Sequence, residues 1–501
     1  MKLIKNLFFI ILAFITIVSY AWGFSSVRKH WNSEGIPITT ALGHQLRSAS
    51  TSDGAIGAII VWEDHRVSHG IPDIYGQRVN ANGVSLWEEN GAPLITALNV
   101  YGELAMQTNP MIDSDSNGGA VFVWEDDRNL QGDIFAQRVN GNGVDQWQIN
   151  GVPISTACFP SGICTNYKHN PQIISDGDRG AIITWYEIRD GFHFSVWGQR
   201  VSANGATAWT LDGGPVAYGS FNADFPKIVT DGMGGAIIAW QDGRDGYKIF
   251  AQRLNADGTP QWISNGIELS PAIGLRGLGG HSLISDGSGG AIIVWVDRRT
   301  INDANIYAQK IDSNGQIQWQ ADGVPICTRP MEQYLPVLST DGAGGAIITW
   351  EDQGASPPGS GQQWIFAQRI SASGVPLWNI DGIPIHTFHG FTPQIASDGN
   401  QGAFIVWNST IIVDPYFHKP SVFAQHVNAE GRTLWTPDGF VVYSEPYGNY
   451  GHAPNVISDG AGGVIIHWKD YRHTNTFYDI YAQRIKEIKG IPCLQLLLLN
   501  N

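Results

Sequence analysis

A Trp-x-Asp/Glu-x-Arg pattern is the commonest arrangement of chemically active side chains in this chain. It occurs six times, for example at Trp62, Asp64 and Arg66. One catalytic centre has no use for six copies of the same carboxylate and guanidinium pair, so the repetition favours a structural role. We expect each Asp to pair with its Arg at the end of a structural unit, with a later Arg such as Arg78 as a further partner.

Motifs for metal binding and nucleophilic catalysis are weak. The segment DSDSNGG at 113–119 imitates the opening of a calcium loop, but Trp124 stands where the loop requires its last acidic ligand. The fourteen His residues include no HExxH motif, and neither GxSxG nor a P-loop occurs. We therefore predict no metal and no cofactor.

The charge and the cysteines narrow the class of protein. A net charge of −15 argues against a nucleic-acid partner, because phosphate binding needs a basic surface. Four Cys residues are too few for a disulfide scaffold, and no CxxC spacing occurs. Cys158 and Cys164 close a short loop, and whether they pair after export stays open.

The N-terminal residues predict export. Lys2 and Lys5 precede an apolar run over 7–18, followed by small residues, which is typical of a secretory signal peptide over residues 1–23, cut after Ala21 or Gly23. The alternative, a membrane anchor, would need a longer apolar run. We expect a secreted, extracellular or cell-surface protein, or a periplasmic one, with no membrane span in the mature chain.

A phrase of the type DGAGGAIITWED (341–352) recurs eight times and defines the organisation of the chain. An Asp lies nine positions and a Gly five positions before each Trp, and successive copies are 55 to 62 residues apart. Such spacing indicates a repeat fold. The structural Trp series is Trp62, Trp124, Trp185, Trp240, Trp295, Trp350, Trp407 and Trp468.

Each copy predicts four short strands. The first is of the PQIISDG type, and the second, GAIITW, has the continuous apolar run of a strand buried on both faces. An Asp-Gly-x-Gly-Gly turn joins them. The third strand is of the DIYAQRVN type and ends in an Asn-Gly hairpin turn, and the fourth follows a second Trp.

The second Trp series predicts that the chain closes on itself. Its first member, Trp31, precedes the first copy, and the eighth copy stops after its third strand at 479–485. We therefore predict an all-β fold, an eight-bladed β-propeller over 24–486, whose last blade is completed by residues 30–39. An open solenoid is the alternative and leaves Trp31 unexplained. The role of the tail, 487–501, is undefined.

Two families resemble these repeats. SDG…GAIIVWEDDR…DIFAQRVNGNG resembles the TolB-type propeller repeat, and IYAQKIDSNGQIQW is similar to the quinoprotein dehydrogenase repeat. The whole pattern is similar to secreted bacterial repeat proteins, which implies export to the surface or medium. The adjacent Cys pair typical of quinoprotein dehydrogenases is absent, so a quinone cofactor is not supported.

Variation among the copies predicts the position of a site. The first-to-second and third-to-fourth turns are nearly uniform, whereas the second-to-third loops and the connections between blades vary and gather on the other face. Variable loops on a rigid scaffold are a common binding surface. The aromatic and His residues predicted to bind ligand there are Tyr167, His169, Phe192, His193, His386, His389, Tyr416, His418, Tyr447 and His452.

Three functions remain open. The first is a monomeric, non-catalytic propeller that binds a glycan, peptide or protein on the variable face. The second is a carbohydrate-active propeller enzyme, a glycoside hydrolase or lyase, and a hydrolase would need carboxylates converging on the channel. The third is a purely structural surface module.

Overall fold

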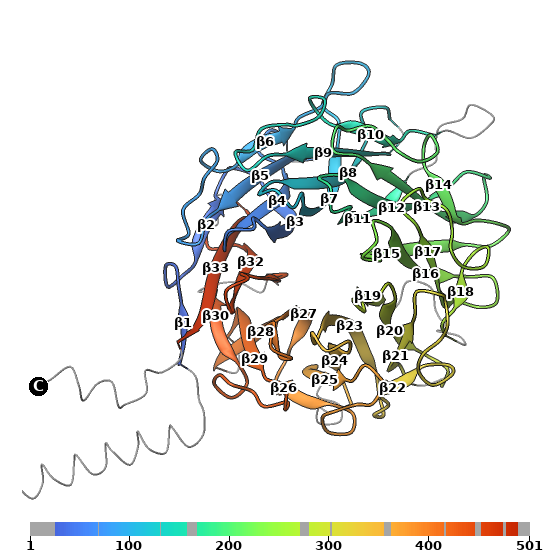
Figure 1. Cartoon of the computed structure of the whole chain (residues 1–501). Helices are drawn as coiled ribbons and strands as arrows, with labels where there is room; N and C mark the ends of the chain where they lie inside the picture. The colour runs from blue at the N-terminus through green and yellow to red at the C-terminus, as the bar shows by residue number, and fades with distance from the viewer. Residues whose placement is uncertain are drawn as a thin grey trace, which may run out of the picture.

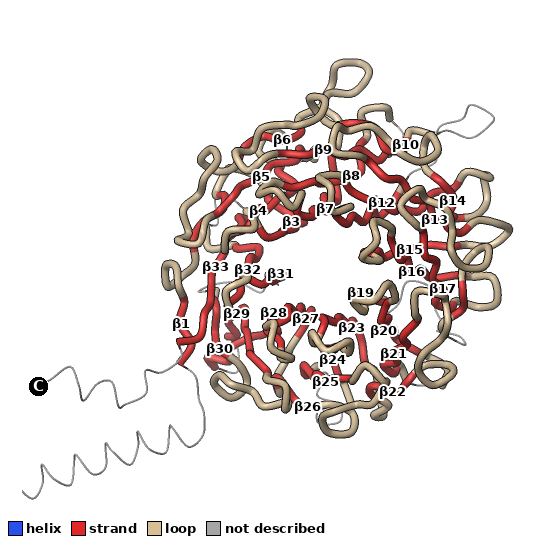
Figure 2. Tube along the Cα trace, viewed as in Figure 1, coloured by secondary structure: helices blue, strands red, loops and turns tan. Residues whose placement is uncertain are grey.

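The computed structural model describes residues 26–68, 70–130, 132–157, 168–270, 280–300, 303–354, 362–414, 417–445, 452–473 and 477–488. All regular secondary structure in these ranges is β-strand (Figure 2). Among the described residues, no helix has the length and apolarity needed to cross a membrane. The predicted signal peptide, residues 1–23, lies outside them, as do residues 489–501 of the tail.

Eight antiparallel sheets surround a common axis, so the predicted eight-bladed β-propeller is confirmed (Figure 1). In blades one to seven the first strand lies nearest the axis and the others follow outward in chain order. Blades one to four contain β3 (Gln45–Ser52), β4 (Ala58–Asp64), β5 (Asp73–Val79) and β6 (Ala92–Ile95); β7 (Gln107–Ser114), β8 (Ala120–Asp126), β9 (Asp133–Val139) and β10 (Val152–Ser155); β11 (His169–Ser175), β12 (Ala181–Ile188), β13 (Phe194–Val201) and β14 (Gly214–Ala217); β15 (Ala223–Thr230), β16 (Ala236–Asp242), β17 (Lys248–Leu254) and β18 (Ile267–Glu268).

The second half of the ring has the same plan, and the eighth blade includes strands from both ends of the chain. Blades five to eight contain β19 (His281–Ser285), β20 (Ala291–Asp297), β21 (Asn305–Ile311) and β22 (Val324–Cys327); β23 (Gln333–Thr340), β24 (Ala346–Asp352), β25 (Trp364–Ile370) and β26 (Ile383–His386); β27 (Phe391–Ser397), β28 (Ala403–Asp414), β29 (Phe417–Val427) and β30 (Phe440–Ser444); β31 (Asn455–Ser458), β32 (Gly463–Asp470), β33 (Asp479–Ile488), β2 (Ile36–Thr39) and β1 (Ser26–Lys29).

The N-terminal segment closes the ring. β2 pairs antiparallel with β33, Ile36 opposite Ala482 and Thr39 opposite Ile480. The prediction that residues 30–39 complete the last blade is therefore confirmed. The sequence did not predict β1, which pairs with the end of β33 through Ile488, two residues beyond the predicted boundary at 486.

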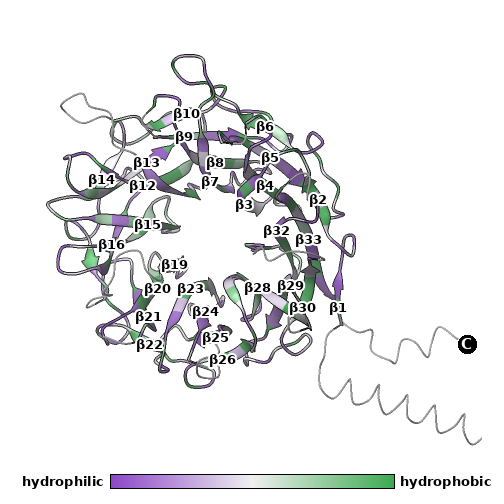
Figure 3. Cartoon of the chain, turned by 180° about the vertical axis from the view of Figure 1, so that it is seen from behind, coloured by the Kyte–Doolittle hydropathy of each residue, from purple (hydrophilic) through white to green (hydrophobic). Residues whose placement is uncertain are grey.

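The second strand of each blade forms the core. All seven residues of β4 are buried, as are those of β16, β20 and β24, because both faces of these strands pack against neighbouring blades. The Trp of the repeated phrase is fully buried in all eight blades. Figure 3 shows hydrophobic residues along the strands of the ring.

The repeated Asp caps the turn between the first two strands. Asp53 Oδ1 accepts two backbone N–H groups of its turn, and Oδ2 accepts from Arg78 Nε at 3.0 Å. The third-strand Arg therefore pairs with the turn Asp, and the expectation that Arg78 joins Asp64 is wrong. The same pair occurs in every blade, with Lys310 and His426 replacing Arg in blades five and seven.

The Trp-x-Asp-x-Arg pattern forms a clamp at the other end of the blade. Asp64 accepts from Trp62 Nε1 at 2.8 Å and from Arg66 at 2.8 and 2.6 Å. Arg66 also donates to the Asn90 carbonyl at 2.7 Å and stacks over Tyr75. Five other blades repeat the ion pair, so the predicted structural pairing is confirmed.

Neighbouring blades are joined by the second Trp series. Trp87 Nε1 donates to the Gly141 carbonyl of the next blade at 3.1 Å. At the closing junction, Trp31 Nε1 donates to the Ala81 carbonyl at 3.1 Å, and Arg484 donates to the same carbonyl at 3.1 Å. Blade eight therefore contacts blade one through the same kind of hydrogen bond that joins blade one to blade two.

The junction between blades seven and eight is different. The outer strands of blade eight come from the N-terminus, and at this junction a side chain of β33 stands where the other junctions have a turn carbonyl. This side chain is Glu487, which accepts from Trp435 Nε1 at 2.8 Å and from His426 Nδ1. His426 Nε2 contacts the turn residue Asp398 at 2.9 Å.

Candidate functional site

The register of the inner strands defines the two ends of the ring. In blade one, Gln45 at the start of β3 pairs with Asp64 at the end of β4. The loop between strands two and three therefore lies beside the connection that enters the blade, and blades two, four and six have the same register. The face predicted from variable loops is thus one end of the propeller, and the starts of the inner strands lie there.

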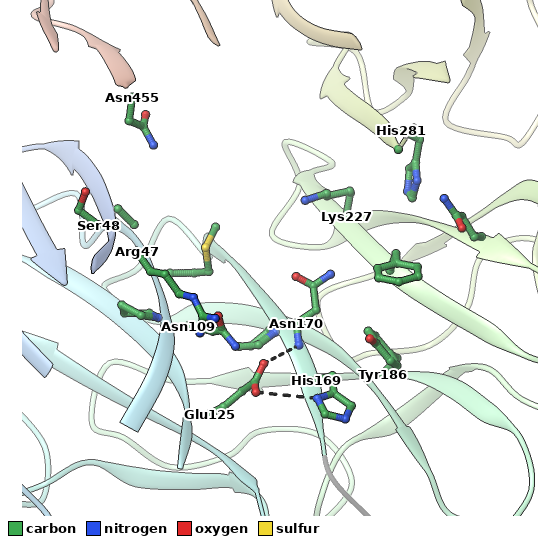
Figure 4. A pocket seen from close by; sticks show the side chains of 17 residues that line it. Arg47, Ser48, Asn109, Glu125, His169, Asn170, Tyr186, Lys227, His281 and Asn455 are labelled. Atoms are coloured by element: carbon green, nitrogen blue, oxygen red, sulfur yellow. Dashed lines mark hydrogen bonds and ion pairs between the residues drawn. The ribbon is translucent and has the colours of Figure 1, made fainter. Parts of the chain in front are cut away.

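A pocket of about 660 Å³ lies among these strand starts, within the roughly 300–1,000 Å³ typical of small-molecule sites. It is formed by blades one to five and blade eight, and Figure 4 shows side chains from opposite sides of the pocket. Its polar and charged lining residues are Arg47, Ser48, Asn109, Glu125, His169, Asn170, Lys227, Gln241, His281 and Asn455.

β-bulges position the lining residues. Asn109 and Asn170 have φ angles of 54° and 53°, at register shifts near the starts of β7 and β11. Carboxylates of the preceding blades stabilise the bulges: Glu63 Oε1 accepts from Asn109 N at 2.7 Å and Glu125 Oε1 from Asn170 N at 2.9 Å. A bulge re-aims a side chain, and here both amides line the pocket.

Aromatic rings form one wall of the pocket. Tyr186 lies between His169 and Phe225, with ring centroids 5.5 Å from each, and Phe194 packs on it at 5.2 Å. His169 Nδ1 is 3.9 Å from Glu125 Oε2. The wall therefore combines apolar ring faces with polar edges.

Lys227 and His281 lie on one side of the pocket, opposite Arg47 (Figure 4). Lys227 Nζ donates to Gln172 Oε1 at 3.4 Å. Among the described residues, no carboxylate oxygen lies within 4 Å of Lys227 Nζ, so this ammonium group forms no described ion pair. Burial lowers the pKa of Lys227. Arg47, by contrast, pairs with Glu63 at 3.1 Å.

His281 is neutral at neutral pH. Burial, and next the positive charge of Lys227, lower the pKa of His281 to about 4. Its Nε2 lies 3.2 Å from the Ala239 carbonyl, which accepts only, so the proton sits on Nε2. Nδ1 is then the acceptor atom of the ring.

The eight blades give an internal comparison for Lys227. In each blade, one residue of the first strand pairs with the residue that precedes the buried Trp of the second strand. This first-strand residue differs from blade to blade, and it is a cation only in blade four. In blade order these residues are Ala49, Met111, Gln172, Lys227, Ser282, Val337, Gln394 and Asn455.

Of the predicted ligand-binding residues, His169 lines the pocket. Phe192 and His193 lie on the loop after β12 at the same end, outside the pocket lining. Phe192 is 81% exposed, and His193 Nδ1 is 2.8 Å from Asp190 Oδ2. Phe192 and His193 stay predicted contacts for a ligand that extends beyond the pocket onto this loop.

His386 and His452 are buried within the fold. His386 Nε2 is 2.8 Å from Ser409 Oγ, and His452 Nδ1 donates to the Lys469 carbonyl at 2.9 Å. His389 stacks on a neighbouring aromatic ring. All three residues have contacts within the fold and lie outside the pocket lining, and their predicted ligand role stays a prediction.

Several predicted positions lie outside the described residues. These are Tyr167, Tyr416, Tyr447, Cys158 and Cys164, and their roles stay predictions. The backbone of His418 belongs to β29, but its side chain is outside the description.

The calcium-like segment is a capped turn. Asp115 Oδ1 accepts from Asn117 N and Gly119 N, each at 2.8 Å, and Oδ2 pairs with Arg138. Within the described ranges, no group of three His, Cys, Asp or Glu side chains could hold a metal ion.

The sequence did not predict Lys227, His281 or the two bulge amides as site residues. The site was expected on the variable loops, whereas these residues lie on the first strands. The signal was nevertheless present, because lining up the eight copies shows a single Lys at the position of Lys227.

The comparisons with known proteins are distant. No protein-family model and no curated protein matches the chain. Among solved structures, an ulvan lyase of a polysaccharide lyase family bound to a saccharide is 8% identical, covers 92% of this chain and 94% of its own, and has a TM-score of 0.42. A Dyadobacter fermentans protein of unknown function is 11% identical, with 67% and 98% covered and a TM-score of 0.37.

A third solved structure, an α-L-arabinanase of Penicillium chrysogenum complexed with arabinobiose, is 11% identical over 52% of this chain and 92% of its own, with a TM-score of 0.31. Because all three scores are below 0.5, no functional argument is drawn from these similarities.

Proposed function

We propose that this protein binds a carbohydrate in the pocket at the channel mouth. The observation that carries the proposal is the aromatic wall of His169, Tyr186 and Phe225 facing the amides Asn109 and Asn170. Ring faces pack on the apolar faces of a sugar, and amides both donate to and accept from hydroxyls. The pocket also lies at the end of the ring where the loops vary.

A carbohydrate-active enzyme is the second candidate. A two-carboxylate hydrolase needs a pair of acids about 5–9.5 Å apart. Among the described lining residues Glu125 is the one carboxylate, and it holds the Asn170 bulge. The observation favouring catalysis is instead the His281 imidazole in the pocket lining, because histidine is the side chain that most often transfers protons in enzymes, so a lyase fits the enzyme alternative better than such a hydrolase.

Glycan-array screening of the full mature protein, followed by calorimetric titration, tests the binding proposal. We expect Asn455→Ala and Phe225→Leu to weaken binding of the array ligand by about tenfold, the effect of losing one good contact. Asn142→Ala, on an exposed turn at the opposite end of the ring, is the control. Absence of any glycan binding would refute the proposal and favour the purely structural module.

Incubation with the polysaccharide that binds separates the two candidates. Chain cleavage that is lost in His281→Asn, while binding is retained, would establish the enzyme. An intact polysaccharide after prolonged incubation would leave binding alone.

Export is part of the proposal. It is supported by β1, which begins at Ser26, beyond both predicted cleavage points at Ala21 and Gly23, so cleavage would spare both N-terminal strands of blade eight. N-terminal sequencing of protein recovered from the medium or cell surface tests it, and a retained Met1 would contradict it.

A further inference from the structure

We infer that the saccharide bound in the pocket is acidic, and that Lys227 binds its carboxylate or sulfate group. The inference rests on the proposed carbohydrate-binding function and adds the class of ligand. It follows from three features of Lys227: its place in the pocket, the groups around it, and its position in the repeat.

Two other lysines that lie against the strands of this propeller are paired with acids. The fully buried Lys168 donates to Asp133 at 2.9 Å, and Lys310 lies 3.3 Å from Asp286. Lys227 has only the neutral Gln172 as a described hydrogen-bond acceptor. Burying an ammonium group without an acid is costly, so a ligand that supplies the acid gains affinity.

The neighbours of Lys227 suit an anion. The amide N–H groups of Gln172 donate to Asn170 and to the Pro171 carbonyl, so Gln172 offers Lys227 only its neutral Oε1, and His281, on the next blade, is uncharged at neutral pH. The carboxylates Glu125 and Glu63 are engaged by the bulges of blades three and two. An anionic group at Lys227 would therefore meet the ammonium group, while the acids are held by other contacts.

The position of Lys227 is not needed for folding. The equivalent residues in blades three and seven are Gln172 and Gln394, and that in blade two is Met111. The fold thus accommodates uncharged residues at this place. A lysine that departs from the repeat, faces a pocket and lacks an acid is better explained by a ligand than by the scaffold.

The test uses a glycan array that contains uronate-bearing, sulfated and neutral oligosaccharides. We expect the wild-type protein to retain acidic glycans and not their carboxyl-reduced or desulfated counterparts. Lys227→Gln, which copies blades three and seven, should weaken acidic-glycan binding by about tenfold or more, the effect of losing a charged hydrogen bond. Lys227→Arg should retain most of it.

Lys248→Gln is the control. It removes one positive charge from the third strand of the same blade, where Lys248 pairs with Glu268 away from the pocket lining. Melting curves of all variants establish that they fold.

Each outcome is decisive. Equal binding of neutral counterparts, or acidic-glycan binding unchanged in Lys227→Gln, would overturn the acidic ligand and leave the carbohydrate proposal standing. Absence of binding to every glycan would overturn both. If Lys227→Gln loses binding only to the uronate-bearing glycans, the bound group is a carboxylate. If it loses binding only to the sulfated glycans, the bound group is a sulfate.

Discussion

Single side chains in the clamps carry much of the stability of each blade. In blade six the fourth residue after the Trp is Gly354, and Arg329 from the preceding connection pairs with Asp352 at 3.2 Å instead. In blade seven Ser409 replaces the Asp, and Trp407 Nε1 has no hydrogen-bond partner among the described residues. Blade seven therefore has the weakest clamp of the ring.

Asp126→Ala should destabilise the protein by about 3–5 kcal/mol, because it leaves Arg128 without its acid and Trp124 Nε1 without an acceptor. Urea unfolding measures the effect. Asp178→Ala, at an exposed turn, should stay within about 0.5 kcal/mol of wild type. Equal midpoints for the two variants would contradict the structural role of the clamp.

Cys327 should not react with iodoacetamide in the folded protein. It is fully buried, and burial, followed by the negative charge of Asp352, raises the pKa of its thiol above the usual range. Mass spectrometry before and after denaturation measures the labelling. Rapid labelling of Cys327 in native protein would show that blade five opens readily.

At the scale of elements, the junction between blades seven and eight contains a histidine, His426, at the place where most other blades have an arginine. His426 lies between Asp398 and Glu487, stacks on Phe404 and packs against Trp435. Burial alone would lower the pKa of His426, but the two carboxylates outweigh it and raise the pKa. The imidazole ring therefore bridges the two blades.

This contact should make stability pH-dependent. Because the folded pKa of His426 is raised above the unfolded value of about 6.5, its contribution is fully present below that pH and is lost as pH rises through the folded pKa. His426→Arg, which restores the residue of most other blades, should remove this part of the dependence. Melting temperatures across the range measure it, and identical pH profiles for wild type and variant would refute it.

At the scale of the molecule, the ring depends on closure by the N-terminal segment. An added Cβ on Gly83 would lie 2.8 Å from Trp31, and one on Gly143 would lie 2.9 Å from Trp87. The indole of every blade except blade seven thus packs on a glycine of the next turn, at the closing junction as elsewhere. Closure leaves no blade face without a neighbour.

Trp31→Ala should therefore cost about as much as Trp87→Ala, roughly 2 kcal/mol for these half-buried rings, less than the 3–5 kcal/mol of a fully buried aromatic residue. Deletion through residue 40 should prevent stable folding, whereas deletion through residue 25 should not. Denaturant unfolding and size-exclusion chromatography check these outcomes. A stable ring without residues 26–40 would refute closure by β2.

The repeats were sufficient to predict the scaffold. The period of the Trp, the continuous apolar run of the second strand and the early Trp31 determine eight blades and their closure, because hydrophobic periodicity and turn chemistry are local properties. They could not predict β1, because its pairing depends on how far β33 extends. Nor could they assign Arg78 to Asp53, since two carboxylates of the same repeat were available.

The site was decided only by the tertiary structure. Arg47, Asn170, Lys227 and His281 belong to four different blades and lie one or two repeats apart in the sequence. Local patterns carry no information on which inner strands meet around the axis. The closed ring brings these strand starts together, and the bulges turn their side chains into one pocket.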